Sequence, residues 1–257
     1  MTHHISRRQF GTMTFGAIGS IALGSACGAS ELQQPRVRIA ARPRSGVKTT
    51  GSGSRPLGLA SGRDAILHLP PGQAAGALPL LVLLHGAGGS GGGILKRLSS
   101  YSDEAGVVVM APDSRQSTWD AIGGKFGPDV SFINDALQAT FELVSVDPER
   151  IAVGGFSDGA SYAISLGLQN GHLFHRVLAY SPGFFVGGEL EGKPSFFISH
   201  GTADQILPID RCSRLIVPAL KKVGYDVTFR QFDGGHDIPP SIAQAGMKWV
   251  ADKPQSS

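Results

Sequence analysis

The residues best placed to do chemistry surround Ser157, in the segment Gly155-Phe156-Ser157-Asp158-Gly159. This segment follows an apolar run over 151–154 and precedes a helical pattern over 158–169, so the serine occupies a sharp strand-to-helix turn. Such a turn exposes the hydroxyl at the carboxyl edge of a sheet, and the following helix directs its positive end at the site. The pattern predicts that Ser157 is a nucleophile.

A second segment, Gly88-Gly89-Ser90-Gly91-Gly92, fits the same pattern. The chain has 36 glycines, so chance matches to a glycine-rich motif are expected. Ser90 lies several residues beyond the apolar strand at 80–84, inside a run of glycines, whereas Ser157 follows its strand almost directly. We therefore assign the nucleophile to Ser157.

A serine hydroxyl is a poor nucleophile near neutral pH, so a base must accept its proton and a carboxylate must orient that base. His236 follows the apolar run that ends at Phe232, and Asp204 follows the run at 195–199. Both positions lie just past a predicted strand, as Ser157 does. We predict His236 as the base and Asp204 as the orienting acid, with Asp210 as the alternative acid.

Ester or amide chemistry also needs donors for the developing oxyanion. The segment His85-Gly86-Ala87-Gly88-Gly89 follows the strand at 80–84, which is the usual position of one backbone donor. We predict that the amides of Ala87 and Asp158 form the oxyanion hole, with Gly88 as the next candidate. His85 is expected to brace this loop rather than to do chemistry.

The same glycines pose an alternative, because Gly86 to Gly91 fits the dinucleotide-binding fingerprint and Asp113 follows in the region of the ribose-binding acid. Two features argue against nucleotide binding: His85 separates the strand from the glycines, and Asp113 lies beyond the end of its strand, after Pro112. We therefore expect no organic cofactor. No group of residues has metal-ligand spacing, so we expect no metal.

The surrounding sequence predicts the elements that position these residues. Short apolar runs alternate with amphipathic stretches from about residue 60, which indicates an α/β fold with a mostly parallel central sheet and helices on both faces. The strands are expected near 64–69, 80–84, 107–110, 151–154, 176–180, 195–199 and 227–232, and the helices near 94–104, 131–144, 158–169, 210–223 and 240–251. Asp129 or Ser131 would cap the second helix. The long loop over 113–129 is expected to be functional.

The first residues differ in character from this pattern. Ser6-Arg7-Arg8-Gln9-Phe10 precedes an uncharged stretch over 15–26, which indicates a twin-arginine export signal over residues 1–27. A permanent membrane anchor is the alternative. Cys27 is placed as a lipidated cysteine would be, so it is either lipidated or removed. Residues 28–60 are predicted to be a basic, flexible linker, and residues 61–253 the catalytic domain.

The net charge of +3 belongs to the N-terminal part of the chain. Eight of the 23 basic residues precede residue 57, against one acidic residue, so 57–257 carries 15 basic and 19 acidic residues. A nucleic-acid partner is therefore not expected. The basic segment is either a solvated linker or a leash on an anionic envelope surface.

Several segments together resemble esterases grouped with polyhydroxybutyrate depolymerases and feruloyl esterases, and also the phospholipase/carboxylesterase branch that includes acyl-protein thioesterases. The resemblance covers about residues 62–251 and rests on Leu83-Leu84-His85-Gly86-Ala87-Gly88-Gly89, Trp119-Asp120, Asp129-Val130-Ser131-Phe132, Gly154-Gly155-Phe156-Ser157-Asp158-Gly159-Ala160, His200-Gly201-Thr202-Ala203-Asp204 and Gly235-His236. It implies the α/β-hydrolase fold and carboxylic-ester hydrolysis without a cofactor. Asp158 departs from the small or uncharged residue of many relatives, and its carboxylate is expected to disfavour anionic substrates.

The resemblance also suggests that Trp119 lines an acyl or aryl pocket, with a buried packing tryptophan as the alternative. No insertion large enough for a lid domain lies between 180 and 195, which favours short-chain, aryl or polyester substrates. We expect an exported enzyme, extracellular, periplasmic or attached to the envelope through Cys27, whose partner is a small or polymeric ester. A non-catalytic binding module on the same fold is the second hypothesis.

Overall fold

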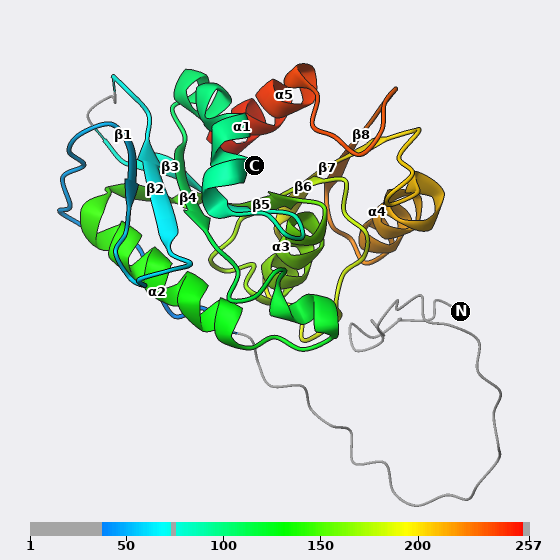
Figure 1. The fold of residues 1–257 in the computed structure, drawn as a ribbon, viewed down its shortest axis with the longest axis horizontal. Helices are drawn as coiled ribbons and strands as arrows, with labels where there is room; N and C mark the ends of the chain where they lie inside the picture. The colour runs from blue at the N-terminus through cyan, green and yellow to red at the C-terminus, as the bar shows by residue number, and fades with distance from the viewer. Residues whose placement is uncertain (1–37, 73–75, 254–257) are drawn as a thin grey trace, which may run out of the picture.

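A single mixed sheet organises the computed structural model, which describes residues 38–72 and 76–253. Within that part of the chain the sheet has eight strands in the order β1-β2-β4-β3-β5-β6-β7-β8 (Figure 1). Their bounds are β1 Gly53–Pro56, β2 Ala65–Leu69, β3 Leu78–Leu84, β4 Val108–Pro112, β5 Val146–Phe156, β6 Arg176–Tyr180, β7 Ser195–Gly201 and β8 Val227–Phe232. The strands from β4 to β8 are parallel, whereas β1 and β2 are antiparallel to their neighbours.

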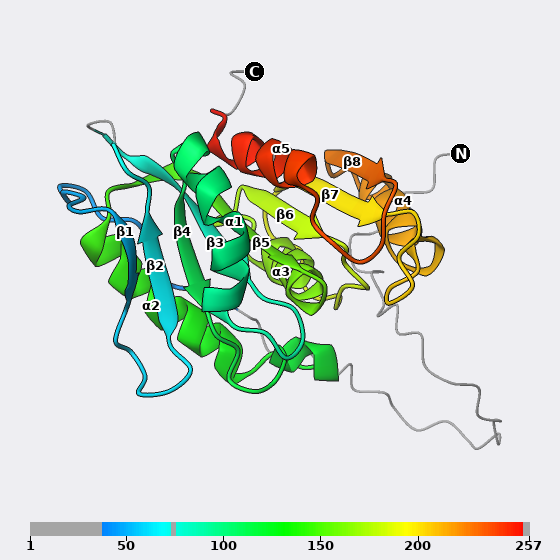
Figure 2. The same ribbon diagram turned by 45° about the horizontal axis from the view of Figure 1, so that its top comes forward.

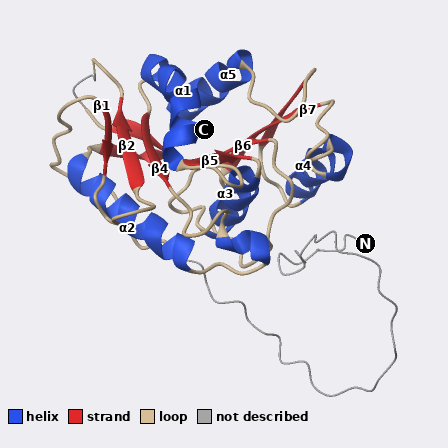
Figure 3. Cartoon of the chain, viewed as in Figure 1, coloured by secondary structure: helices blue, strands red, loops and turns tan. Residues whose placement is uncertain are grey.

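Helices cover both faces of this sheet, as the alternation of strand and helix patterns predicted (Figures 2 and 3). They are α1 Gly91–Ala105, α2 Pro128–Leu143, α3 Asp158–Gln169, α4 Ser213–Lys222 and α5 Pro240–Ala251, with short 3-10 turns η1 Asp120–Gly123 and η2 Ile209–Arg211. Side chains of α1 and α5 pack in one core, and those of α2, α3 and α4 in the other. All seven predicted strands and all five predicted helices are present.

The side chains of β3 show how one apolar run fills both cores. Leu80, Val82 and Leu84 point into the core with α2, α3 and α4, and Leu81 and Leu83 point into the core with α1 and α5. All five are fully buried. A central parallel strand has no solvent-facing side, so its sequence is continuously apolar instead of alternating. Such a run predicts a strand at the centre of the sheet, not at its edge.

The carboxyl ends of β5, β7 and β8 define the edge where the candidate residues meet. These strands belong to one parallel series, so their ends lie on the same side of the sheet. Ser157 follows β5 directly, Asp204 lies three residues after β7 and His236 lies four residues after β8. Connections of this kind allow residues far apart in the chain to converge at one edge of an α/β sheet.

The beginning of α1 accounts for the second glycine-serine match. Ser90 is the N-cap of this helix, and its hydroxyl accepts a hydrogen bond from the Gly93 amide at 3.1 Å. Asp113 accepts a hydrogen bond from the Gly91 amide at 2.6 Å, so a carboxylate of the chain already occupies the helix N-terminus. Ser90 thus caps this helix. A bound pyrophosphate would need the same helix N-terminus that Asp113 occupies, which argues against the dinucleotide hypothesis.

The domain begins earlier than the predicted boundary at residue 61. Ile39 is fully buried, and its amide donates to the Asn170 side chain at 2.8 Å. Residues 53–56 form β1, which pairs with β2 at the sheet edge. The prediction of a flexible linker over 28–60 is therefore wrong for residues 38–60. The basic, glycine-rich composition suggested a linker, although Ile39 and Ala41 are buried in the core. The side chains of β1 are exposed and the strand pairs through its backbone, so its sequence has no apolar pattern.

The predicted export signal over 1–27, including Arg7, Arg8 and Cys27, lies outside the described residues, as does the first part of the predicted linker. Within the described ranges, no helix has the length and apolar composition required to cross a bilayer. Cys212 is buried in the domain.

Candidate active site

Ser157 is located at the turn from β5 to α3 and adopts a strained backbone, with φ 58° and ψ −121°. Residues other than glycine rarely have positive φ, and such strain concentrates at functional sites. The turn is held by the Ser157 amide, which donates to Tyr180 O at 2.9 Å, and by its carbonyl, which accepts from Ala160 and Ser161 at 3.0 Å. The sharp strand-to-helix turn inferred from the sequence is thus present in the fold.

Both glycines of the motif are required by close backbone approach. A Cβ on Gly155 would lie 2.5 Å from the Gly159 carbonyl carbon and 2.7 Å from Leu84 O. A Cβ on Gly159 would lie 2.4 Å from Leu84 O and 2.5 Å from His85 O. Real Cβ atoms do not approach backbone oxygens this closely, so the first turn of α3 packs directly against the end of β3. The glycines therefore bring Ser157 next to the predicted oxyanion loop.

Asp204 and His236 are in direct contact, with 2.6 Å between Asp204 Oδ2 and His236 Nδ1. The other carboxylate oxygen, Oδ1, accepts hydrogen bonds from the amides of Ile206 at 2.9 Å and Leu207 at 2.8 Å. Burial opposes ionisation of Asp204, but the hydrogen bonds from Leu207 and His236 outweigh it, so its pKa lies below the usual value. An ionised Asp204 accepts a hydrogen bond from the Nδ1–H of His236 and leaves Nε2 free to act as a base.

A second histidine, His200, contacts the same carboxylate and was not singled out from the sequence. Its Nε2 lies 2.7 Å from Leu207 O and 3.2 Å from Asp204 Oδ2, so this nitrogen carries the proton. Its Nδ1 then accepts from the Ser213 hydroxyl at 2.7 Å. Burial lowers the pKa of His200, which keeps the ring neutral. The only available signal was its place at the end of β7, four residues before Asp204.

The His236 ring packs against Phe156, the residue immediately before Ser157. The two ring centroids are 4.6 Å apart. The Arg97 guanidinium lies over the Phe156 ring, 5.3 Å from its centroid. Arg97 also forms an ion pair with Asp237, so α1 contacts the His236 loop. In the described residues no hydrogen bond joins Ser157 to His236. Catalytic hydrogen bonds often tighten only when substrate binds, so this pairing stays a prediction.

The predicted oxyanion loop passes beside Ser157. A Cβ on Gly86 would lie 3.3 Å from Ser157 Cβ. Within the described part of the chain, no hydrogen bond occupies the amide of Ala87 or that of Asp158, so both donors are available. The Gly88 amide instead donates to Ser117 O at 2.7 Å. This contact corrects the prediction of Gly88 as the next substrate-binding oxyanion donor, because its amide is already used within the protein.

His85 has the bracing position that we expected. Its Nδ1 lies 2.7 Å from Gly86 O, and its Nε2 accepts from the Ser114 amide at 3.0 Å. Arg63, which the sequence did not indicate, approaches Nε2 at 3.3 Å and Gly89 O at 3.3 Å. Burial, more than any other cause, lowers the pKa of His85, so the ring is neutral with its proton on Nδ1. The ring is therefore a fixed connector between the oxyanion loop and Ser114.

Trp119 does not line an open pocket, and this corrects the first interpretation of that residue. Its side chain is 1% exposed, and its Nε1 donates to His85 O at 2.8 Å. The ring packs between His85, at 4.9 Å, and Tyr162, at 5.2 Å between centroids. A buried indole needs a hydrogen-bond acceptor, and the oxyanion loop supplies it. The structure thus shows Trp119 as a buried packing residue, which is the second of the two interpretations.

Asp129 does not cap α2, which begins at Pro128 after Gly127 with no side-chain cap. Instead Asp129 and Asp120 each accept the amide of the other, at 2.7 and 2.8 Å. Asp129 also accepts from the Arg115 amide at 2.5 Å, and Tyr162 OH donates to Asp120 at 3.2 Å. Burial raises the pKa of Asp129. The two aspartates close the base of the 113–127 loop. The predicted capping role is therefore wrong for Asp129, because its carboxylate binds backbone amides of the loop instead of the helix.

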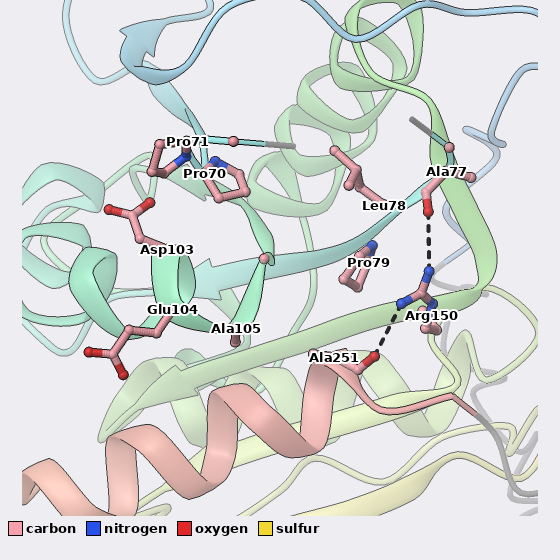
Figure 4. A pocket seen from close by; sticks show the side chains of 13 residues that line it. Pro70, Pro71, Ala77, Leu78, Pro79, Asp103, Glu104, Ala105, Arg150 and Ala251 are labelled. Carbon is pink, nitrogen blue, oxygen red and sulfur yellow. Dashed lines mark hydrogen bonds between the residues drawn. The ribbon is translucent and has the colours of Figure 1, made fainter. Parts of the chain in front are cut away.

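A cavity of about 440 Å³ lies at the opposite edge of the sheet, near the start of β3 and the ends of α1 and α5 (Figure 4). Arg150 reaches along it and donates to Ala77 O and Ala251 O, both at 3.1 Å, as the dashed lines in the figure show. This cavity is separate from the site at Ser157. No group of three or more His, Cys, Asp or Glu side chains in the described ranges is arranged to hold a metal ion.

Part of the sequence is similar to a known protein family and to individual known proteins. Residues 129–252 match the phospholipase/carboxylesterase family. Over 103 residues the chain is 31% identical to acyl-protein thioesterase 1 of Gibberella zeae, a match that covers 36% of this chain and 43% of that protein. The matched segments span less than half the length of the curated relatives.

Solved structures extend the likeness to most of the domain. FphF, a fluorophosphonate-binding serine hydrolase of Staphylococcus aureus, superposes with a TM-score of 0.62 at 16% identity, over 79% of this chain and 100% of that one. Thermogutta terrifontis esterase 2 superposes with a TM-score of 0.58 at 21% identity, over 82% and 96% of the two chains. At these identities the likeness establishes the fold. The chain therefore has the α/β-hydrolase fold, and its residues 129–252 are similar to the phospholipase/carboxylesterase family.

Proposed function

We propose that the chain is a serine hydrolase that cleaves carboxylic esters through an acyl-enzyme intermediate. The observation that carries this proposal is the 2.6 Å contact of Asp204 with His236 at the sheet edge where Ser157 has its strained backbone. A carboxylate, an imidazole and a partly exposed serine at one edge are the parts that nucleophilic acyl transfer requires. The phospholipase/carboxylesterase match over 129–252, which includes all three residues, supports the assignment.

In the first half of the reaction, Ser157 Oγ attacks the ester carbonyl carbon while its proton passes to His236 Nε2. The tetrahedral oxyanion accepts hydrogen bonds from the amides of Ala87 and Asp158. When this intermediate collapses, the ester C–O bond breaks and His236 returns the proton to the leaving alcohol. Asp204 stays ionised throughout, because it holds the proton of Nδ1 in a hydrogen bond and stabilises the imidazolium.

In the second half, water replaces the alcohol. His236 takes a proton from the water as its oxygen attacks the acyl carbon, and the same two amides hold the second oxyanion. The bond to Ser157 Oγ then breaks, the proton returns to that oxygen and the carboxylic acid leaves. The hydroxyl of the water ends in the acid, and its other hydrogen restores the Ser157 hydroxyl in place of the one that left with the alcohol.

Short-chain, aryl or polyester substrates fit the molecule better than long lipids. The segment between β6 and β7 has 14 residues, from 181 to 194, and it contains no helix or strand that could form a lid domain. Most of it packs against α3, for instance through the amides of Gly183 and Val186, which donate to the hydroxyls of Ser161 and Ser165. A site without a large cover is accessible to a polymer chain as well as to small esters.

The decisive experiment replaces the predicted nucleophile. Ser157→Ala is expected to lower hydrolysis of p-nitrophenyl acetate by about a million-fold in kcat, the scale for loss of a triad nucleophile. Circular dichroism and the melting temperature should remain close to those of the wild type. Ser90→Ala is the matched control, because it removes the serine of the other glycine-flanked segment and leaves the triad intact.

A fluorophosphonate probe adds a second readout. We expect covalent labelling of the wild type and of Ser90→Ala, at Ser157, and no labelling of Ser157→Ala. A folded wild-type protein that neither turns over esters nor reacts with the probe would contradict the proposal and favour a binding module on the hydrolase fold. A panel of acetyl, butyryl, octanoyl and feruloyl esters would then define the acyl preference.

We also propose that the enzyme is exported. The support is the twin-arginine segment Ser6–Phe10 followed by the uncharged stretch over 15–26. Replacing Arg7 and Arg8 by lysine should retain the protein in the cytoplasmic fraction, whereas the wild type should reach the periplasm, envelope or medium. Metabolic labelling with a fatty acid, compared between the wild type and Cys27→Ser, would show whether Cys27 anchors it. Unchanged fractionation of the lysine variant would contradict export by this route.

A further inference from the structure

Three consecutive residues of the 113–127 loop contact different parts of the predicted oxyanion machinery. Ser117 O accepts the Gly88 amide at 2.7 Å, and Trp119 Nε1 donates to His85 O at 2.8 Å, so both residues hold the loop over 85–89. Between them, Thr118 Oγ1 donates to Asp158 Oδ2 at 2.7 Å. Asp158 begins α3 directly after the nucleophile. The tripeptide 117–119 therefore bridges the two segments that supply the oxyanion donors.

The base of this bridge is itself rigid. The reciprocal amide contacts of Asp120 and Asp129 close the loop immediately after Trp119. On the other side, the Ser114 amide donates to His85, and the Ser114 hydroxyl donates to Gln116 O at 2.6 Å. The tripeptide thus has fixed attachments before and after it, so the Thr118 hydroxyl is held in place and does not follow the motion of a free loop.

The acceptor in this bridge is an unusual group for its position. Asp158 carries a carboxylate one residue after Ser157, and its own amide is a predicted oxyanion donor. A negative charge near a developing oxyanion raises the energy of the transition state, and the effect is strong where water is excluded. A hydrogen bond from a neutral hydroxyl to a carboxylate is charge-assisted and directional, so it restricts where that charge can be.

We propose that Thr118 is a positioning residue of the oxyanion hole, whose hydroxyl tethers the Asp158 carboxylate to the 113–127 loop. The tether keeps the Asp158 carboxylate in one orientation. Through the neighbouring residues Ser117 and Trp119, it also connects Asp158 to the 85–89 loop, which contains the Ala87 amide. This inference rests on the proposed ester hydrolysis and adds to it a residue that touches neither substrate nor the reacting atoms. It also gives the 113–127 loop a defined part in the reaction.

The test is a double-mutant cycle at the two partners. Thr118→Val removes the hydroxyl with little change of shape and is expected to lower kcat for p-nitrophenyl acetate about tenfold, the scale of one hydrogen bond to a charged group. KM should change less than about twofold, because the ground-state carbonyl carries no full charge. Thr118→Ser, which keeps the hydroxyl, should retain most of the wild-type kcat.

The second arm removes the charge. Asp158→Asn removes the charge and retains the backbone donor, and the kcat of this variant is the reference for the second Thr118 substitution. In the Asp158→Asn background, Thr118→Val should cost less than about twofold. A residue that only supported the fold would cost the same factor in both backgrounds, so this non-additivity separates positioning from packing.

Two results would overturn the inference: a folded Thr118→Val variant with wild-type kcat, or an equal loss in both Asp158 backgrounds. Melting temperatures verify folding, and Thr50→Val, an exposed threonine remote from the site, is the matched control. Failure of the proposed function is distinguishable, because then the wild type itself would show neither turnover nor fluorophosphonate labelling. Labelling of Thr118→Val at Ser157, slower than in the wild type, would accompany the expected outcome.

Discussion

At the residue scale, the carboxylate of Asp204 is shared by two histidines with different tasks. His236 is partly exposed, and its Nδ1 is the ring nitrogen that contacts Asp204, so its Nε2 can gain and lose a proton during a reaction. His200 is fully buried and neutral, with both ring nitrogens used in hydrogen bonds to Leu207 and Ser213. His200 therefore supports the loop that presents Asp204, while His236 is the group that we propose exchanges protons.

The buried histidines predict how stability depends on pH. Burial lowers the pKa values of His85 and His200 below 6.5, so the folded state binds these protons more weakly than the unfolded state. Their contribution to stability is complete above pH 6.5 and is lost as the pH falls from 6.5 through the folded pKa values. The pKa of Asp204 is also lowered, so its contribution is lost only below the range of an ordinary carboxylate.

We therefore expect the free energy of unfolding in urea to decrease from about pH 7.5 to about pH 5.5. His200→Gln, which cannot take up the proton, should show a smaller decrease than the wild type, since only one of the two buried rings remains. His172→Gln is the matched control, because that histidine is exposed. An identical decrease in the wild type and His200→Gln would show that His200 does not contribute to acid sensitivity.

At the element scale, the contact between the first turn of α3 and the end of β3 determines where the nucleophile lies. Gly159 packs against the carbonyls of Leu84 and His85, so α3, β3 and the oxyanion loop meet without an intervening side chain. The Ser157 turn and the Ala87 amide thereby become a single unit. This close approach is the physical reason for a glycine two residues after the nucleophile.

Gly159→Ala is expected to displace these elements. Its Cβ would lie 2.4 Å from Leu84 O, so β3 or α3 must shift by a substantial fraction of an ångström. A displacement of about 1 Å at reacting groups costs about a hundredfold in rate, and we expect a loss of kcat on that scale together with a lower melting temperature. Gly123→Ala is the control, because its Cβ meets nothing within 4 Å. Near wild-type kcat in a folded Gly159→Ala variant would contradict this account.

At the scale of the whole molecule, the segment before β2 belongs to the folded domain. Ile39 inserts into the core next to α2 and α3, and the amides of Ala40 and Ala41 donate to the Asn134 side chain at 2.8 and 3.0 Å. β1 then extends the sheet by one edge strand. Truncation for expression should therefore leave residue 38 and everything after it in place.

Ile39→Ala tests this attachment. Removal of a fully buried isoleucine side chain typically costs about 2 to 5 kcal/mol, so we expect a loss in that range in urea unfolding. Leu59→Ala is the control, because Leu59 is 41% exposed and its truncation should cost well under 1 kcal/mol, about the scale of a surface change. A cost below about 0.5 kcal/mol for Ile39→Ala would mean that the segment detaches in solution.

The sequence by itself determined all the strands of the described sheet except β1, the strand-to-helix turn at Ser157 and the placement of Asp204 and His236 after strands. These features are local: an apolar run with no alternation indicates a buried parallel strand, and glycines around a serine indicate a sharp turn. Parallel strands then bring their carboxyl ends to one edge whatever the details of packing. The α/β class of the fold and the candidate triad both follow from such local patterns, whereas the α/β-hydrolase fold was what the resemblance implied.

Tertiary structure alone decided the partners of Trp119, Asp129, His200 and Ile39. Each of these residues has chemistry that suits several environments: an indole can line a pocket or brace a loop, and an aspartate can cap a helix or bind another loop. The choice depends on which groups meet across long stretches of chain, such as Ile39 with Asn170 or Thr118 with Asp158. Local sequence carries no record of those distances, because only the packed sheet and helices bring the partners together.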